Sequence, residues 1–334
     1  MNIYKLLKLN RYIKNHRLKF LALYVMHRLN MRYLAVNLDP VMACNLRCTM
    51  CYFTDPDYVK GLKGQLKDSE LERIAEVIFK RALKLQIGCG TEPTLYKNLV
   101  RIVELGKRYK VPYISLTTNA NLLTEDKIIA LLDAGLNEFT ISLHGVKKET
   151  YEEFMQKGNY DTFHNVFNIF SNLKKTRDFK VRINYTFNND NFNELETFFD
   201  HFDGNSFDIL QIRPIQKLGN TAYNNFSLDT LRHDYSSIIG SVRKNCKENG
   251  IILLAPKEIP NTSEMNVSSL IFDYTFCYIS PEKFWKPDFQ WRNQSFNSFS
   301  RQIGWSNTLF ENIFKSKADL QSLSNRLNYE IEFN

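Results

Sequence analysis

The most informative segment of this 334-residue chain reads Met42-Ala43-Cys44-Asn45-Leu46-Arg47-Cys48-Thr49-Met50-Cys51-Tyr52. It contains three of the six cysteines, spaced C-x3-C-x2-C. Thiolates this close together typically hold a metal or an iron–sulfur cluster. A structural zinc site closes with four ligands, whereas a [4Fe–4S] cluster held by three cysteines leaves one iron open to a small molecule. A zinc site completed by a distant residue and buried, unligated cysteines are the alternatives that the spacing leaves open.

A second loop follows the short predicted strand Leu85-Gln86-Ile87 and reads Gly88-Cys89-Gly90-Thr91-Glu92-Pro93. Its two glycines let the backbone approach a ligand closely. We expect Glu92 to lie on the same face of the sheet as the cysteine loop, where a carboxylate could face an ammonium group. We expect Cys89 to be a small buried residue rather than a fourth ligand.

Strand-like and helix-like segments alternate through the first two thirds of the chain. Such alternation predicts a parallel sheet, and six units predict an open, partial (β/α)6 TIM-like barrel. Thr124 is expected to cap a helix that ends before Gly135, and the polar segment from Asp55 to Lys67 is expected to be a loop. The predicted strands are 33–38, 85–87, 113–116, 138–143, 180–187 and 207–212.

Composition and charge distribution suggest three parts. With 43% apolar and 24% charged residues the chain reads as a globular α/β protein. Residues 1–34 hold eight of the 44 basic residues and no acidic residue, which leaves 36 basic against 36 acidic residues in the remainder. We divide the chain into a basic amphipathic N-terminal helical arm (1–34), a partial barrel (35–225) and a C-terminal α+β extension (226–334), which also contains a predicted strand at 251–255.

The cysteine spacing, with Asn45 inside it, resembles the radical S-adenosylmethionine (radical SAM) superfamily. The resemblance implies that the open iron of one [4Fe–4S] cluster, held by Cys44, Cys48 and Cys51, chelates the amino and carboxylate groups of S-adenosylmethionine. An electron from the cluster would then give methionine and a 5′-deoxyadenosyl radical. The family commonly has an aromatic residue near the adenine before its last cysteine; here Met50 takes that place, with Tyr52 just after the motif.

The resemblance extends to the next loops of the predicted barrel. Gly90-Thr91-Glu92-Pro93 is similar to the Gly-Gly-Glu-Pro element of the family, which contacts the methionyl amino group, with Thr91 in place of the second glycine. Segments between Thr117 and Thr162 resemble the peptide-modifying, SPASM-type branch. That branch implies that polar groups at strand ends contact the ribose and carboxylate of the cofactor, here Thr118, Asn119 and Ser142.

Two further polar residues end predicted strands. His144 could reach a substrate, and a hydrogen-bonded histidine without a catalytic role is the alternative. Arg213 could bind a carboxylate or a phosphate, and a salt-bridged structural arginine is the alternative. No catalytic residue can be assigned.

The C-terminal part resembles a degenerate SPASM or twitch extension. Cys277 and the segment 303–316 carry this resemblance. In that extension further cysteines hold auxiliary clusters, but Cys246 and Cys277 alone cannot supply the ligands of a second cluster. We therefore predict one cluster, reduced by an external donor of the flavodoxin or ferredoxin type.

The basic arm has apolar residues at roughly helical spacing. It can be interpreted as a helix packed on the domain, as an interfacial helix that makes a peripheral membrane contact, or as a nucleic-acid arm. The neutral body lacks the broad basic face of a nucleic-acid-binding protein, so no nucleic acid is predicted as a partner. The unpaired cysteine pattern and an oxygen-sensitive cluster suggest a reducing cytoplasm, with membrane association at its inner face as an option.

The resemblance implies an enzyme that abstracts hydrogen from its substrate. From the branch we favour a peptide or small protein over other small molecules. A glycan or lipid-linked intermediate at the membrane surface is the second interpretation, which the basic arm would suit. A tRNA substrate is the third, against which the neutral body counts. A non-catalytic binding module is an interpretation of a different class, and the intact cysteine motif and Glu92 count against it.

Overall fold

The computed structural model describes residues 13–216, 219–259, 270–316, 319–320 and 331–333. Its centre is one nine-stranded sheet in the order β8-β1-β2-β3-β4-β5-β6-β7-β9. Eight strands run parallel, and β9 pairs antiparallel with β7. The strands are β1 (Leu34–Leu38), β2 (Ala82–Ile87), β3 (Ile114–Thr118), β4 (Glu138–Leu143), β5 (Lys180–Phe187), β6 (Ile209–Pro214), β7 (Ile252–Pro256), β8 (Phe276–Ile279) and β9 (Ile331–Phe333).

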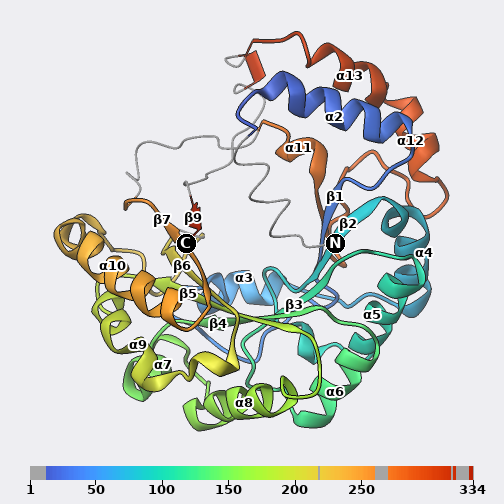
Figure 1. Cartoon of the computed structure of the whole chain (residues 1–334). Coiled ribbons are helices and arrows are strands. Elements are labelled where there is room, and N and C mark those ends of the chain that lie inside the picture. Colours follow the sequence, from blue (N-terminus) through green and yellow to red (C-terminus); the bar gives the residue numbers. More distant parts are fainter. Residues whose placement is uncertain (1–12, 217–218, 260–269, 317–318, 321–330, 334) are drawn as a thin grey trace.

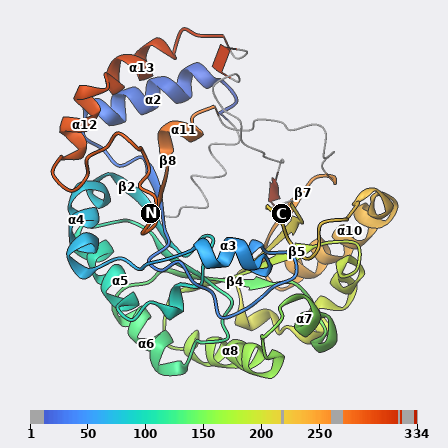
Figure 2. The same cartoon turned by 180° about the vertical axis from the view of Figure 1, so that it is seen from behind.

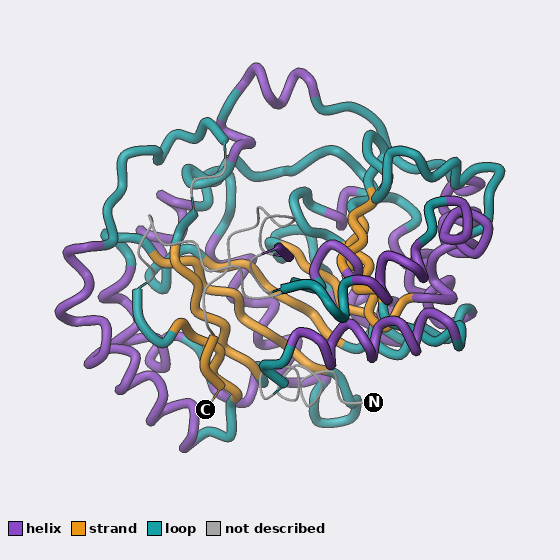
Figure 3. Tube along the Cα trace, turned by 90° about the horizontal axis from the view of Figure 1, so that it is seen from above, coloured by secondary structure: helices purple, strands orange, loops and turns teal. Residues whose placement is uncertain are grey.

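The sheet curves into an open crescent with helices along its outer side (Figures 1 and 3). This confirms the predicted partial barrel. The helix α6 begins where predicted, because the Thr124 hydroxyl accepts a hydrogen bond from the Lys127 N–H at 3.3 Å, and Gly135 follows its end at a φ of +101°. The outer helices are α4 (Asp68–Ile78), α5 (Leu99–Arg108), α6 (Glu125–Asp133), α7 (Lys148–Phe154), α8 (Tyr160–Leu173), α9 (Phe198–His201) and α10 (Arg232–Glu248).

The sheet is larger than the six predicted strands. The β7 strand lies where the sequence predicts one and pairs with β6, and β8 pairs in parallel with β1. Both come from the region assigned to a separate C-terminal extension. An edge strand exposes unpaired backbone groups. Here β7 pairs with these groups on β6, and β8 pairs with those on β1. The boundary near residue 225 is therefore not a boundary of the sheet.

One short helix lies where the sequence suggested only a loop. The helix α3 (Pro56–Gly61) begins after Asp55, whose carboxylate accepts from the backbone N–H groups of Asp57 and Tyr58 at 3.0 and 3.2 Å. Pro56 occupies the first helical position, where its missing N–H costs nothing. Figure 2 shows α3 in front of the strands. It follows the cysteine loop directly and so borders the candidate site.

Helices from the two ends of the chain form a layer beside the sheet. The N-terminal helix α2 (His16–Arg28) lies alongside α13 (Trp305–Glu311), as Figures 1 and 2 both show. The helices α11 (Phe272–Thr275) and α12 (Phe296–Gln302) adjoin them. Of the helices that the structure describes, none combines the length and the apolar character needed to cross a membrane.

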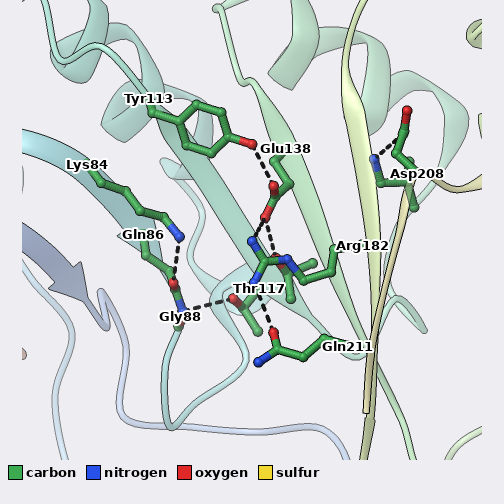
Figure 4. A network of polar contacts seen from close by, with 11 residues as sticks. Lys84, Gln86, Gly88, Tyr113, Thr117, Glu138, Arg182, Asp208 and Gln211 are labelled. Carbon is green, nitrogen blue, oxygen red and sulfur yellow. Dashed lines mark hydrogen bonds and ion pairs between the residues drawn. The ribbon is translucent and has the colours of Figure 1, made fainter. Parts of the chain in front are cut away.

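The concave face of the sheet is polar. Figure 4 shows a network in which Glu138, at 0% exposure, accepts from the Tyr113 hydroxyl at 2.5 Å and pairs with Arg182 at 2.9 Å. Arg182 also donates to Gln211 at 2.9 Å. These side chains come from β4, β5 and β6 and the start of β3. A buried charge is stable only when it is paired in this way, so the network holds neighbouring strands in register.

We expect Glu138→Ala to lower the free energy of unfolding by about 3–5 kcal/mol, because it leaves the mostly buried Arg182 without its carboxylate. Chemical denaturation monitored by circular dichroism measures this. The control is Glu72→Ala, which removes a partly exposed pairing with Arg101 and should change stability by less than about 1 kcal/mol. Equal stability of the two variants would contradict the structural role of the network.

Candidate active site

The carboxyl ends of six parallel strands surround one cavity of about 270 Å³. The three clustered cysteines line it from the loop after β1. The loops and ends of β2 to β6 contribute the remaining polar lining, which includes Gly90, Thr91, Glu92, Thr117, Thr118, Asn119, Ser142, His144, Thr186 and Arg213. Every site residue predicted from the sequence lines this cavity. Residues as far apart in sequence as 44 and 213 meet here because parallel strands end at the same edge.

The cysteine loop is fixed by its backbone and by apolar neighbours. The Arg47 and Thr49 N–H groups donate to the carbonyls of Gln156 and Phe154, both at 2.9 Å. Leu46 and Met50, at 0% and 5% exposure, alternate with the thiols and are buried. The loop therefore turns its cysteines toward the cavity and Leu46 toward the core, while Met50 packs on the core and also borders the cavity.

The three thiols suit a cluster better than a single ion. Burial raises the pKa of the Cys44 thiol to about 11 and that of Cys48 well above its usual value, and the neighbouring thiols add to both shifts. Thiolates in such surroundings need a cationic partner, which iron supplies. A [4Fe–4S] cluster suits three thiols on one short loop, because each cysteine binds a different iron.

Glu92 lies at the wall of the cavity with 2% exposure. Its Oε1 accepts from the Thr94 N–H at 3.0 Å and from the Thr118 hydroxyl at 2.7 Å, and its Oε2 accepts from the Asn119 N–H at 2.8 Å. Burial raises the pKa of Glu92, while these donors oppose that shift. Thr118 and Asn119 thus orient Glu92 in this structure. Their contact with the cofactor, like that of Glu92, stays a prediction.

Asp39 is a site residue that the sequence reading did not single out. It is fully buried and accepts from the Cys89 N–H at 2.7 Å, the Gly90 N–H at 3.1 Å and the Thr91 hydroxyl at 3.1 Å. The Tyr278 hydroxyl of β8 donates to the same carboxylate at 2.9 Å. Asp39 therefore holds the loop that precedes Glu92. The threonine that departs from the family pattern, Thr91, supplies one of these donors.

Tyr52 and Gly90 fit each other closely. The Tyr52 hydroxyl donates to the Gly90 carbonyl, and a Cβ at position 90 would collide with the hydroxyl oxygen. Met50 also lines the cavity, and its sulfur accepts from the Asn188 amide at 3.2 Å. The position of either side chain relative to an adenine stays a prediction.

Three cysteines lie outside the motif, and one of them, Cys89, was expected to be buried. Cys89 is exposed rather than buried and lies in the cavity lining, 3.2 Å from the Asn37 amide oxygen. The expectation of a buried residue was wrong because the loop held by Asp39 turns this side chain into the open cavity. Cys246 on α10 and Cys277 on β8 are both fully buried. The strand β8 lies at one edge of the sheet, whereas β7, which follows α10 in the chain, lies near the other edge.

His144 and Arg213 lie in the cavity lining with the cysteines. Burial and the charge of Arg213 lower the pKa of His144 to about 4, so its imidazole is neutral near pH 7. Its Nδ1 is buried without a hydrogen-bond partner among the described residues. A buried ring nitrogen of this kind is suited to contact a bound molecule.

Residues 40–202 match the family described as the radical SAM superfamily. This segment of the chain belongs to the radical SAM superfamily. Members of the radical SAM family use a [4Fe–4S] cluster together with S-adenosylmethionine, and the cysteine loop and cavity fit both. The matched segment contains the three cysteines, the Glu92 loop and the ends of β3 and β4.

Proteins named as GTP 3′,8-cyclases resemble the radical SAM segment. GTP 3′,8-cyclase of Aquifex aeolicus is 30% identical over 164 residues, which are 47% of this chain and 49% of that protein. A probable GTP 3′,8-cyclase of Saccharolobus solfataricus is 28% identical over 54% of this chain and 57% of its own length. The chain therefore matches about half the length of these relatives.

The fold resembles solved radical SAM structures over a longer stretch. SuiB of Streptococcus suis bound to S-adenosylmethionine superposes with a TM-score of 0.60 at 17% identity, over 86% of this chain and 69% of SuiB. The protein anSMEcpe with bound S-adenosylmethionine gives a TM-score of 0.51 at 20% identity, over 65% of this chain and 59% of its own. At these identities the similarity establishes the fold.

We expect Gly90→Ala to lower the rate of 5′-deoxyadenosine formation on the order of tenfold to a hundredfold, because the added methyl group displaces Tyr52 or the loop. Anaerobic assays with chromatographic detection measure the product. The control is Gly240→Ala on α10, where nothing lies within 4 Å of the new methyl group. A Gly90→Ala enzyme as active as this control would show that the close fit is not needed.

Proposed function

We propose that this chain is a radical SAM enzyme that binds one [4Fe–4S] cluster through Cys44, Cys48 and Cys51 and S-adenosylmethionine beside it. The observation that supports this most directly is that the three thiols and Glu92 share the lining of one cavity. When bound, the cluster supplies the electron that cleaves S-adenosylmethionine to methionine and a 5′-deoxyadenosyl radical, which takes a hydrogen atom from the substrate.

The residues of the chain would bind and orient S-adenosylmethionine and shield the reacting atoms from water. Glu92, held by Thr118 and Asn119, would place a carboxylate against the methionyl ammonium group. The buried Met50, which borders the cavity, would help to keep water from the reacting atoms. The protein would thus aim the radical, while the cofactor carries the difficult chemistry.

For the substrate we propose a peptide or small protein. Arg213 is the one Lys or Arg among the described residues that line the cavity, and neutral His144 lies in the same lining. One guanidinium suits one carboxylate, such as that of a peptide, better than the several charges of a triphosphate. SuiB has been crystallised with its precursor peptide, and its fold matches 83% of this chain in that complex.

GTP is the second candidate substrate, because the relatives found by sequence are named GTP 3′,8-cyclases. The electron would come from an external flavodoxin or ferredoxin in either case, since the cysteines outside the motif lie apart from one another.

An anaerobic assay tests these proposals. The reconstituted chain is given dithionite and S-adenosylmethionine, alone, with GTP, or with deuterated peptides encoded near its gene. We expect 5′-deoxyadenosine to form in all three reactions. We expect it to carry deuterium only in the reaction with the cognate peptide. If a chain with a full cluster formed no 5′-deoxyadenosine, the proposed enzymatic activity would be refuted. Consumption of GTP coupled to formation of 5′-deoxyadenosine would show that GTP, and not a peptide, is the substrate.

A further inference from the structure

The helix α2 has apolar side chains on two opposite faces. One face packs on the domain through Phe20 and Leu23, with 0% and 5% exposure. The other presents Leu18, Leu21, Val25 and Leu29 to solvent, with exposures of 55%, 44%, 42% and 66%. At 100° per residue these four side chains fall within a stripe about 80° wide. The stripe is therefore continuous along the helix and is not used in packing.

The C-terminal helix α13 adds exposed aromatic side chains beside α2. The ring centroids of Phe310 and Tyr24, which lies on α2, are 5.4 Å apart, and Phe314 meets Phe310 edge-on at 5.3 Å. Phe310 and Phe314 are 48% and 67% exposed. We call the combined surface the docking face; it consists of Leu18, Leu21, Val25, Leu29, Phe310 and Phe314.

Exposed apolar side chains are concentrated in this layer. Of the eleven large hydrophobic side chains that are exposed among the described residues, nine belong to residues 13–31 or 303–314. Scattered exposed hydrophobic residues are ordinary on a protein surface, whereas a group of this size marks a contact with another apolar surface.

Cations flank the apolar stripe. By helical geometry, Lys19 lies on one side of it, and Arg17 and Arg28 lie on the other. Residues 13–34 contain no Asp or Glu. An apolar stripe between rows of cations is the pattern of a helix that lies in the headgroup region of a membrane.

We propose that the docking face binds the surface of an anionic lipid bilayer. The apolar side chains would enter the boundary between headgroups and acyl chains, and the cations would pair with lipid phosphates. A single-stranded nucleic acid would use the cations but has no use for a Leu and Val stripe, because bases stack on aromatic rings. A second copy of the chain would place like charges against each other. This inference is independent of the proposed enzymatic activity.

Sedimentation with vesicles tests the proposal on the full-length chain with its cluster. We expect binding to vesicles of phosphatidylcholine with phosphatidylglycerol, weaker binding at high salt and little binding to phosphatidylcholine alone. Arg17→Gln with Arg28→Gln should lower partitioning roughly thirtyfold. Leu21→Ser with Val25→Ser should also lower the partitioning onto vesicles, although it leaves the charge of the protein unchanged. The matched control, Lys110→Gln with Lys247→Gln, removes two exposed cations elsewhere and should bind like the wild type.

Three outcomes would overturn the proposal. The first is equal binding of the wild type to neutral and anionic vesicles, or none. The second is a dimer in solution that Leu21→Ser with Val25→Ser converts to a monomer, which would make the face an interface between copies. The third is RNA binding that depends on Arg17 and Arg28 but not on Leu21 and Val25. Thermal denaturation shows whether each variant is folded.

Discussion

The Cys48→Ser variant is expected to lose the cluster and, with it, all cleavage of S-adenosylmethionine. Cys48 is the middle cysteine of the motif and lines the cavity. Serine is a poor ligand for iron in place of a thiolate. We expect the iron content to fall far below the value of about four per chain of one [4Fe–4S] cluster. Formation of 5′-deoxyadenosine should fall by at least about three orders of magnitude, because the cofactor carries the electron-transfer step.

Iron analysis, the visible absorption of the cluster and the anaerobic assay together measure this result. The matched control is Cys246→Ala, which removes a fully buried thiol on α10. It should keep its iron and its activity, although the lost packing lowers stability. If Cys48→Ser retained the cluster while Cys246→Ala lost it, the assignment of the ligands would be wrong. Near eight irons in the wild type would contradict the prediction of a single cluster.

Glu92→Gln is expected to leave the cluster in place and to slow cleavage by a hundredfold or more. The amide of glutamine has one oxygen, whereas Glu92 accepts hydrogen bonds on both of its oxygens, from Thr94 and Thr118 on one and from Asn119 on the other. Either orientation of the amide sets a donor against a donor, which costs about 1–3 kcal/mol. Loss of the negative charge beside the methionyl ammonium group adds to this effect.

The measurement is the dependence of 5′-deoxyadenosine formation on the concentration of S-adenosylmethionine. A cofactor-binding role predicts a raised KM, whereas a purely structural role predicts lower stability at an unchanged KM. Glu72→Gln, which alters a partly exposed carboxylate on α4, is the control and should behave like the wild type. A wild-type KM in Glu92→Gln would exclude the contact with the cofactor.

The parts of the fold and site that could be predicted depend on short stretches of sequence. The cysteine spacing, the loop before Glu92 and the cap at Thr124 each lie within a dozen residues, so their signals are local. The helix α3 also had a local signal, since Asp55 before Pro56 is a common start of a helix, but the polar composition around it favoured a loop.

What could not be predicted depends on contacts between distant residues. Tyr278 donates to Asp39 across 239 positions, and no pattern near either residue indicates the pairing. The parallel pairing of β8 with β1 likewise leaves no trace in the sequence of β1, which reads as any buried strand. The sequence showed apolar residues at helical spacing in α2, but it could not show which of them pack on the domain and which face solvent, because the residues of the two faces are interleaved.

The pairing of β8 with β1 has a consequence for the order in which the protein matures. Synthesis delivers the cysteine loop early, but Asp39 gains its bond from Tyr278 only after more than two hundred further residues have left the ribosome. Until then β1 is an unpaired edge next to three unligated thiols, a combination prone to aggregation and oxidation. The support that Asp39 gives to the loop before Glu92 is therefore complete only after β8 has paired with β1.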